Sequence, residues 1–300
     1  MTRTCLPVFA VAAALSFNAA AYTLDATECI HALGSYPFRA RVVVIPEKPK
    51  QGDAVKVCLL DGVYPKEKDG VTIVRDGNRL QVVVHDSSFS WSPNPLISIV
   101  ETLPPLSDGG YTIDAYVEDY FTHALRAVQT NVAFTVDPAA VEFYNIQLGH
   151  YFMTSSWAEA QGIDQGAAGP GWTRTGEAFR ILTAPPPGGQ FQPVYRYYGN
   201  MALDAAGRRI GPNSHFYTQD VAERAAISRD IGWILEGIAF YGLPPAGGDC
   251  PAGSAPLYRL YNGRAAQNDS NHRFTTRLDL FRSMPAQGWI AEGVAMCVGQ

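Results

Sequence analysis

Three histidines, each followed two positions later by an aromatic residue, are the first candidates for chemistry in this sequence. They stand in His150-Tyr151-Phe152, His215-Phe216-Tyr217 and His272-Arg273-Phe274. An aromatic ring can cover the C–H face of a sugar while nearby polar side chains bind its hydroxyl groups. We therefore predict a carbohydrate-binding set that recurs along the chain: Tyr144, His150, Arg196, Tyr198, His215, Arg259, Tyr261 and His272.

Two other roles for these histidines stay open. A buried histidine with both ring nitrogens hydrogen-bonded would hold its hairpin in place and bind no ligand. Three histidines could share a zinc ion only if they converged on one axis, and no two cysteines have the spacing of a zinc knuckle. We expect no metal and no cofactor. If the aromatic sites bind sugars, their repetition favours a polymeric target through avidity.

The sequence carries no familiar catalytic motif. It has no G-x-S-x-G, H-E-x-x-H or P-loop pattern, and the residues around Ser254 lack the spacing of a nucleophile elbow. We therefore predict a non-catalytic protein with no catalytic residues. Because catalytic triads are defined by geometry rather than by spacing, a hydrolase stays open as an alternative.

A repeated pattern positions these candidates. The pattern Trp-x-x-(Thr/Glu)-Gly-x-Ala-(Phe/Met) spans residues 172–179, 233–240 and 289–296. It recurs about every 60 residues, and such a period indicates one structural unit copied in series. We interpret its fixed residues as structural, with tryptophans anchoring the core and glycines permitting a bulge: Trp172, Trp233, Trp289, Gly176, Gly237 and Gly293.

Each unit is predicted to contain a strand, a second strand, a short helix and a third strand. A capping residue, namely Ser156, Asp220 or Thr276, stands three positions before an acid, which is the layout of a capping box. The units cover about 138–183, 192–243 and 255–298. We expect them to close around a pseudo-threefold axis in a β-trefoil-like domain with short helices, because one unit cannot cover its own apolar face.

Charged residues also recur in the units. Two ion pairs are predicted within units, because a lone buried charge is costly: Arg196 with Glu236, and Arg259 with Glu292. The first unit has Glu142 and Thr175 at these places. It is therefore predicted to have lost its pair.

The motifs (V/L)-Y-R-x-Y-N, H-F-Y-T and G-W-x-x-E-G-x-A-F, matched best in the second and third units, closely resemble a repeat of many secreted bacterial proteins. That family is catalogued as a domain of unknown function and often lies beside hydrolase domains. The resemblance implies an accessory or surface-binding role and supplies no ligand. The first half of the chain lies outside it.

The first half reads as short strands between turns. Asp76 and Gly77 between two valine-rich runs predict a hairpin. About seven strands over about 100 residues are typical of an immunoglobulin-like sandwich. Tyr111 resembles the tyrosine that pins a turn in such sandwiches, and alternate residues from it are predicted to face the core. The expected strands are residues 41–45, 54–60, 71–74, 80–84, 96–101, 111–117 and 127–136.

Residues 1–21 read as a secretory signal peptide, with Arg3, an apolar run to Phe17 and a small-residue cleavage site. The run is shorter than the roughly 20 residues that span a bilayer. We expect an exported protein, periplasmic or extracellular, without a membrane span. Its domains are predicted at 22–137 (immunoglobulin-like) and 138–300 (three-repeat). Of the three possible cysteine pairings we favour the two bridges that stay within these domains: Cys29–Cys58 and Cys250–Cys297.

Charge narrows the choice of partner. The chain has 23 basic and 28 acidic residues, a formal net charge of −5, and no basic block. Nucleic acid is therefore not an expected partner. We predict an extracytoplasmic binding module for a glycan or cell-wall polymer. The alternatives are a protein-interaction or inhibitor module that binds through residues 201–213, and an accessory domain of a secreted hydrolase system.

Overall fold

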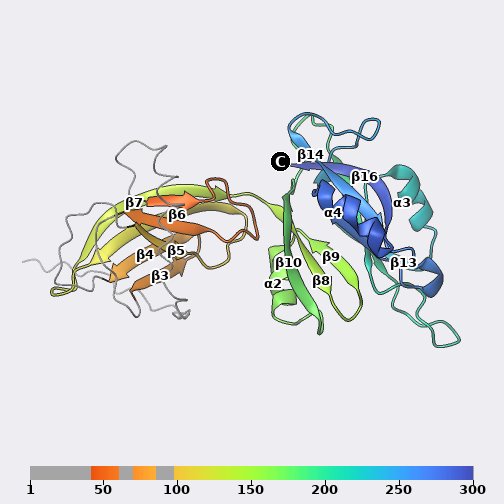
Figure 1. Cartoon of the computed structure of the whole chain (residues 1–300), viewed down its shortest axis with the longest axis horizontal. Coiled ribbons are helices and arrows are strands. Elements are labelled where there is room, and N and C mark those ends of the chain that lie inside the picture. Colours follow the sequence, from red (N-terminus) through yellow and green to blue (C-terminus); the bar gives the residue numbers. More distant parts are fainter. Residues whose placement is uncertain (1–41, 61–69, 86–97, 300) are drawn as a thin grey trace, which may run out of the picture. The chain divides into compact units, whose positions relative to one another are not determined.

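The structure is a computed structural model that describes residues 42–60, 70–85 and 98–299 (Figure 1). Strands dominate these residues, so the prediction of a mainly β protein is confirmed. The chain divides into two compact bodies. The C-terminal body runs from Val136 onward and includes Pro49–Asp53 and Pro105–Gly109, and the other described residues form the N-terminal body.

Seven strands of the described residues build the N-terminal body. One sheet has the order β1-β2-β5 and the other the order β3-β4-β6-β7. The pairs β1–β2, β2–β5 and β3–β4 are antiparallel, whereas β4 and β6 run parallel. Asp76 pairs with Arg79 across the predicted hairpin turn, where Gly77 has a φ of 57°. The strands are β1 (Val42–Ile45), β2 (Lys56–Leu60), β3 (Val71–Asp76), β4 (Arg79–His85), β5 (Ser98–Thr102), β6 (Gly109–Glu118) and β7 (Leu125–Val136).

Strand β6 turns alternate side chains into the core. Tyr111 is buried, its ring stacks on Phe134 with centroids 5.5 Å apart, and its hydroxyl accepts a hydrogen bond from Arg75 at 3.3 Å. The two-residue period of a strand explains which residues follow it inward: Ile113, Ala115 and Val117. The immunoglobulin-like assignment, and the role of Tyr111 at a turn, stay predictions.

Two predictions fall on residues outside the described ranges. The signal peptide at 1–21 is one. The Cys29–Cys58 bridge is the other, because Cys29 lies there, whereas Cys58 is fully buried in β2. Among the described residues, no helix has the length and apolar character needed to cross a membrane.

The C-terminal body contains three successive segments with one element order, which we call modules 1, 2 and 3. Each runs strand, strand, helix, strand, and each forms an antiparallel three-stranded sheet with its first strand in the middle (Figure 1). Module 1 is β8 (Ala139–Asn145), β9 (His150–Thr154), α2 (Trp157–Asp164) and β10 (Trp172–Arg180). Module 2 is β11 (Gln192–Gly199), β12 (His215–Thr218), α3 (Val221–Ile227) and β13 (Trp233–Gly242). Module 3 is β14 (Ser254–Tyr261), β15 (His272–Thr275), α4 (Leu278–Ser283) and β16 (Ile290–Gly299), with short 3-10 turns at η1 (Ala265–Gln267) and η2 (Met284–Gln287).

The three modules share one hydrophobic core. Equivalent residues of the three sheets meet there, because a lone three-stranded sheet leaves an apolar face uncovered: Ala140, Val194 and Leu257 from the first strands, Met153, Tyr217 and Phe274 from the second, and Phe179, Phe240 and Met296 from the third. The five sheets of the described residues are separate and none closes into a barrel. The β-trefoil-like assignment therefore stays a prediction.

Each third strand is bulged at a glycine. Gly176, Gly237 and Gly293 have φ values of 86°, 136° and 97° and lie where the pairing register shifts. Residues with a Cβ rarely adopt such φ values, so the backbone conformation requires glycine at these places.

Two of the three predicted helix caps are present. The side chains of Ser156 and Asp220 each accept a hydrogen bond from the backbone three residues later. The prediction for the third helix is wrong. Arg277, not Thr276, precedes α4, and its side chain makes no capping hydrogen bond. Thr275 instead accepts a hydrogen bond from the backbone N–H of Arg277 at 3.0 Å, so the sequence pattern placed the helix one residue too early.

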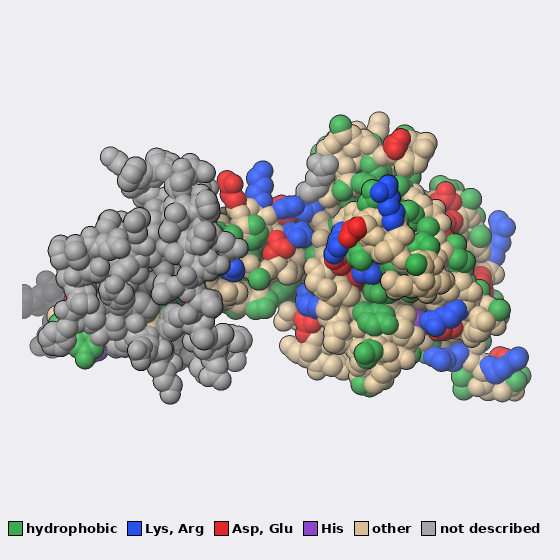
Figure 2. Space-filling model, in the orientation of Figure 1, with side chains coloured by type: hydrophobic (Ala, Val, Ile, Leu, Met, Phe, Trp, Pro, Cys, Tyr) green, Lys and Arg blue, Asp and Glu red, His purple; other side chains and the backbone are tan. Residues whose placement is uncertain are grey.

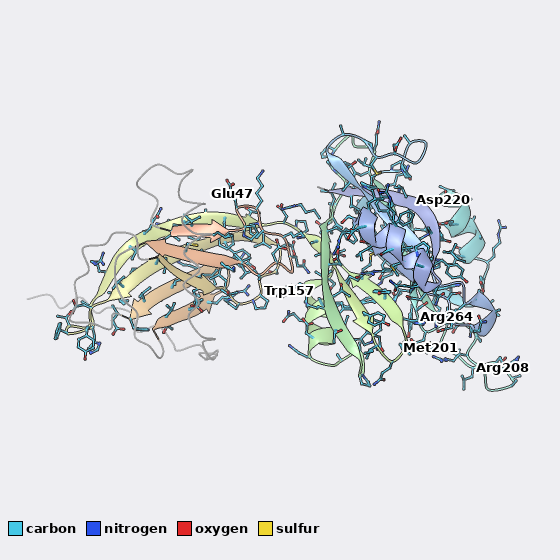
Figure 3. All side chains as sticks on the ribbon, in the orientation of Figure 1. Glu47, Trp157, Met201, Arg208, Asp220 and Arg264 are labelled. Carbon is cyan, nitrogen blue, oxygen red and sulfur yellow. A yellow bond between two sulfur atoms is a disulfide. The ribbon has the colours of Figure 1, made fainter. Side chains whose placement is uncertain are left out.

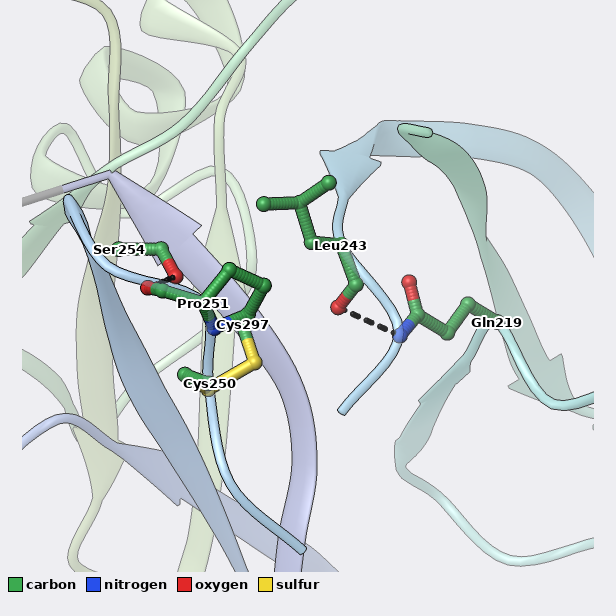
Figure 4. Close-up of a disulfide and its surroundings, with 6 residues drawn as sticks. All are labelled: Gln219, Leu243, Cys250, Pro251, Ser254 and Cys297. Carbon is green, nitrogen blue, oxygen red and sulfur yellow. Dashed lines mark hydrogen bonds between the residues drawn. A yellow bond between two sulfur atoms is a disulfide. The ribbon is translucent and has the colours of Figure 1, made fainter. Parts of the chain in front are cut away.

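A disulfide joins Cys250 to the buried Cys297 of β16, with the two Cα atoms 5.6 Å apart (Figure 4). This predicted bridge is confirmed. Beside it the hydroxyl of Ser254 donates to the Pro251 carbonyl at 2.6 Å. With a sequence separation of 47, the bridge contributes roughly 4 kcal/mol in the chain-entropy model.

Candidate functional site

Strand pairing shows which residues of the three modules are equivalent. Thr154, Thr218 and Thr275 end the second strands and pair with equivalent residues of the first strands. Counting back from them aligns His215 and His272 with Tyr151, not with His150. The prediction of three equivalent histidines is therefore wrong, because module 1 has one more residue between its histidine and its threonine.

His150 holds the modules together. Its ring is 1% exposed, Nδ1 donates to the Asn213 carbonyl at 3.0 Å, and Nε2 contacts Asp269 Oδ1 at 2.7 Å. It thereby links module 1 to modules 2 and 3. The equivalent Ser214 donates to the Ser270 carbonyl, and the equivalent Asn271 bonds the backbone N–H and C=O of Tyr151. Each side chain therefore reaches the next module, and the three links close a ring.

We call the three contacts between modules seams 1–2, 2–3 and 3–1. In seam 1–2, Phe152 of module 1 packs on His215 of module 2 at 4.6 Å, and His215 stacks on Tyr198 at 4.6 Å. Seam 2–3 repeats this order with centroid distances of 4.9 and 4.8 Å: Phe216, His272 and Tyr261. The predicted sugar-binding rings thus pack between modules and are half-buried.

Ion pairs join the same seams. Arg196 contacts Glu236 of its own module at 2.7 Å and Glu159 of module 1 at 2.7 Å. Arg259 contacts Glu292 of its own module at 2.6 Å and binds Glu223 of module 2 with two nitrogens, at 2.6 and 2.9 Å. The two predicted pairs within modules are present. Sequence reasoning missed the second carboxylate of each arginine, although its regular place three residues after the helix cap was a signal.

Seam 3–1 also has an ion pair, but its charges are exchanged and its second member comes from a strand rather than from a helix. Glu142 stands where the other modules have arginine, and Arg273 of module 3 binds both its oxygens, at 2.8 and 2.9 Å. Arg273 also lies over the Tyr151 ring, 4.2 Å from its centroid. Module 1 therefore has no ion pair of its own at these places, as predicted, and Glu142 is paired across the seam instead. The hydroxyl of Thr175 donates to the Glu142 carbonyl at 3.3 Å.

A cleft of about 270 Å³ opens at seam 1–2. Its polar wall is Ser155, Ser156, Glu159, Arg196 and Glu236, and its other wall is the bulged stretch from Gly237 to Phe240. Seam 1–2 is the most accessible of the three at its arginine, whose side chain is 21% exposed, against 13% for Arg259 and 9% for Arg273. The residues of this cleft are the candidate functional site.

Two charged groups of the cleft, Glu236 and Arg196, are held in their ionised forms. Burial opposes ionisation of Glu236, but the hydrogen bond from His215 and the charges of His215 and Arg196 outweigh it and lower the pKa of Glu236. Burial also works against the charged Arg196, yet Glu159 and Glu236 raise its pKa above the ordinary value. Burial raises the pKa of Tyr217, whose hydroxyl donates to the Met153 carbonyl. The cleft therefore offers a guanidinium and a carboxylate that both stay charged near neutral pH.

The remaining predicted residues lie apart from the cleft. Tyr144 packs on Tyr151 at 4.7 Å in seam 3–1, and Tyr261 accepts a hydrogen bond from the Ala265 backbone at 2.9 Å. Trp172 and Trp233 meet Phe152 and Phe216 of their own modules, each at 6.1 Å, whereas Trp289 meets Tyr151 across seam 3–1 at 5.6 Å. Within the described ranges, no group of three acidic, histidine or cysteine side chains is arranged to hold a metal.

Comparison with known proteins gives one match. No curated protein and no solved structure is similar to the chain. The model of a family described as a domain of unknown function matches residues 139–299, the stretch from the first strand of module 1 to the last strand of module 3. Since this is more than half of its 300 residues, the chain belongs to the DUF5648 family, a domain of unknown function.

Proposed function

We propose that the C-terminal body is a non-catalytic binding module for glycans or a cell-wall polymer, with the cleft at seam 1–2 as its site. The observation that carries the proposal is a small polar cleft in which Glu159, Arg196 and Glu236 are fixed by one another. Its volume lies just below the usual range of about 300–1,000 Å³ for drug-sized ligands, which suits a single sugar ring.

Aromatic rings next to the cleft support a sugar ligand. His215 lies 3.3 Å from Glu236 and stacks on Tyr198, so a polar wall and an aromatic stack adjoin. Sugar sites combine such apolar faces with fixed hydrogen-bonding groups. Ile234 pairs with Tyr198 on the neighbouring strand and is half exposed, which extends the apolar surface.

The electrostatics favour binding over catalysis. Glycoside hydrolysis requires one carboxylic acid whose pKa is raised so that it can protonate the leaving group. In the cleft, the pKa of Glu236 is lowered, and Arg196 contacts both carboxylates. Arginine-bound carboxylates are poor general acids near neutral pH.

The proposal includes the setting of the module. The three modules would be copies of one unit around a pseudo-threefold axis, in a β-trefoil-like arrangement beside an immunoglobulin-like domain. Equal element order, equivalent core residues and a closed ring of seam contacts support this. We also propose that the protein acts in the periplasm or outside the cell, on the basis of the signal-peptide pattern at residues 1–21.

The test is a glycan array and a pull-down on insoluble polysaccharides with the full chain. Glu236→Gln is the cleft variant, and Glu292→Gln, which removes the same charge from the equivalent position of module 3, is its control. We expect glycan binding that weakens in Glu236→Gln and persists in Glu292→Gln. A folded chain that retains no glycan on the array would refute the proposal.

A protein-interaction module is the second candidate, and one surface favours it. Strand β13 and the second residue before it expose large apolar side chains at Ile231, Ile234, Leu235 and Ile238. The 201–213 loop, in which Figure 3 labels Met201 and Arg208, extends from the same module. Figure 2 shows acidic and basic side chains interspersed over the visible face of the C-terminal body. Binding that is lost in Leu235→Asp, but unaffected by Glu236→Gln, would favour this alternative.

A further inference from the structure

The two oxygens of each cleft carboxylate differ in their hydrogen bonds. Oε2 of Glu159 accepts from Thr154 and Arg196, and Oε2 of Glu236 receives Arg196 and His215. Within the described residues, the second oxygen of each carboxylate has no hydrogen-bond partner. Arg196 uses Nε and one N–H of Nη1 on these carboxylates, which leaves the N–H groups of Nη2 to donate to a ligand. Two carboxylates against one guanidinium also leave the cleft acidic.

Seam 2–3 provides a comparison, because its helix glutamate is hydrogen-bonded at both oxygens. There Arg259 binds both oxygens of Glu223 and reaches Glu292 with its Nε. No carboxylate oxygen of Glu223 is left over. Arg196 reaches Glu159 through Nη1 alone, so the glutamate of the helix keeps an open oxygen in seam 1–2, where the cleft opens, whereas its equivalent Glu223 has none.

An open carboxylate oxygen binds a donor, and it binds a cationic donor best, because charge-assisted hydrogen bonds are roughly twice as strong as neutral ones. A ligand that carries carboxylate or sulfate groups would meet repulsion from Glu159 and Glu236. Hydroxyl groups satisfy the open oxygens, and a protonated amine satisfies both the geometry and the charge.

We propose that the cleft at seam 1–2 selects glycans that bear free amino groups over acetylated or acidic glycans. This inference rests on the proposed function and names its ligand class. Protonated amines would lie against Glu159 and Glu236, and hydroxyl oxygens of the same sugar would accept from Arg196 Nη2. His215 Nε2 lies 3.3 Å from Glu236 Oε2 and would compete with the ligand for this carboxylate.

The test compares three soluble probes by calorimetry with the full chain at pH 7: a glucosamine hexamer, the N-acetylglucosamine hexamer and a galacturonate oligomer. We expect the glucosamine hexamer to bind at least about 10-fold more tightly than the others, the effect of one charged hydrogen bond. Glu236→Gln should weaken that binding about 10-fold. Glu292→Gln controls for the general attraction of a cationic sugar to an acidic protein, and should change it less than about 2-fold.

The possible outcomes separate the two proposals. Equal or tighter binding of the acetylated or acidic probe overturns the amine preference while leaving a glycan-binding function intact. Equal losses in Glu236→Gln and Glu292→Gln overturn the assignment of the site. If none of the three probes binds, and the array of the preceding section is also negative, the proposed function itself fails.

Discussion

Seams 1–2 and 3–1 differ in the sign of their charges and in their access to solvent. In seam 1–2 an arginine of the later module meets a glutamate of the earlier one, and the side chains stay partly exposed. In seam 3–1 the glutamate is on module 1, the arginine is on module 3, and both are buried. A charged residue at this position of the first strand is therefore kept in both seams, whereas its sign and the element that supplies its partner are not.

The exchange of charges in seam 3–1 is accompanied by other changes of residue type at equivalent positions. Arg273 takes the place of an aromatic ring, Tyr151 takes the place of a histidine, and Leu280 takes the place of the glutamate in the helix. Each change alone would leave a buried charge unpaired or an acid without its base. Together they keep the seam closed, which indicates that opening to solvent at seam 1–2 is a local property and not a consequence of the module design.

The largest predicted effect breaks seam 3–1. Replacing Arg273 with Met leaves Glu142, 3% exposed, without its partner, and should cost about 3–5 kcal/mol of unfolding free energy. Arg196→Met, at the more exposed seam 1–2, should cost less. Urea denaturation followed by tryptophan fluorescence measures both.

Adding Glu142→Gln to Arg273→Met removes the unpaired charge and should restore part of the loss. A double-mutant cycle isolates this coupling. If Arg273→Met costs no more than Arg196→Met, the buried pair is not what holds seam 3–1 closed.

A second prediction concerns a position where modules 1 and 2 differ. Asn145 and Gly199 each pair with the tryptophan that begins the third strand of their module. Copying the asparagine into module 2 as Gly199→Asn should destabilise the protein by about 3 kcal/mol or more, because a Cβ there would lie 1.5 Å from the carbonyl oxygen of Pro212. Thermal unfolding measures the effect.

The reverse change, Asn145→Gly, is the matched control. It removes the hydrogen bonds from the Gln147 and Leu148 backbone N–H groups to the asparagine oxygen, at 2.9 and 3.0 Å, and should cost only about 1–2 kcal/mol. A Gly199→Asn protein as stable as the parent would show that the loop at Pro212 moves freely.

The same comparison shows what the sequence could predict. Element order, glycine bulges and the Cys250–Cys297 bridge were readable because each depends on local spacing or on one residue type. The alignment of His150 with His215 failed because one additional residue in module 1 shifts the strand without changing its pattern.

The sequence could not predict the contacts across seams, and the reason is physical. The partner of Arg196 in module 1 is Glu159, and that of Glu142 in module 3 is Arg273, so each pair joins residues that are far apart in the chain. Periodicity within a unit predicts which residues recur, but not which unit they contact. The cleft was missed for the same reason, since its lining residues come from both module 1 and module 2.

The smallest predicted effect tests the stacked side-chain rings within the seams. Burial, with a smaller contribution from the Arg259 charge, lowers the pKa of His272 in seam 2–3 to about 3. The unfolded chain takes up this proton near the ordinary value of about 6.5, whereas the folded protein does not. The contribution of His272 to the free energy of unfolding is therefore complete above about pH 6.5 and decreases as the pH falls toward 3.

Between pH 7 and pH 5 the loss from His272 should be about 1–2 kcal/mol, measured as the shift of the urea midpoint. His272→Gln should flatten this part of the profile, since no proton is taken up on unfolding. His123→Gln, at a 68% exposed histidine of the N-terminal body, should leave it unchanged. Above pH 5 Glu223 of seam 2–3 stays ionised, because the Arg259 and Thr218 contacts outweigh burial and lower its pKa. A slope that persists in His272→Gln would therefore assign the acid sensitivity to another histidine and show that the ring in seam 2–3 is hydrated.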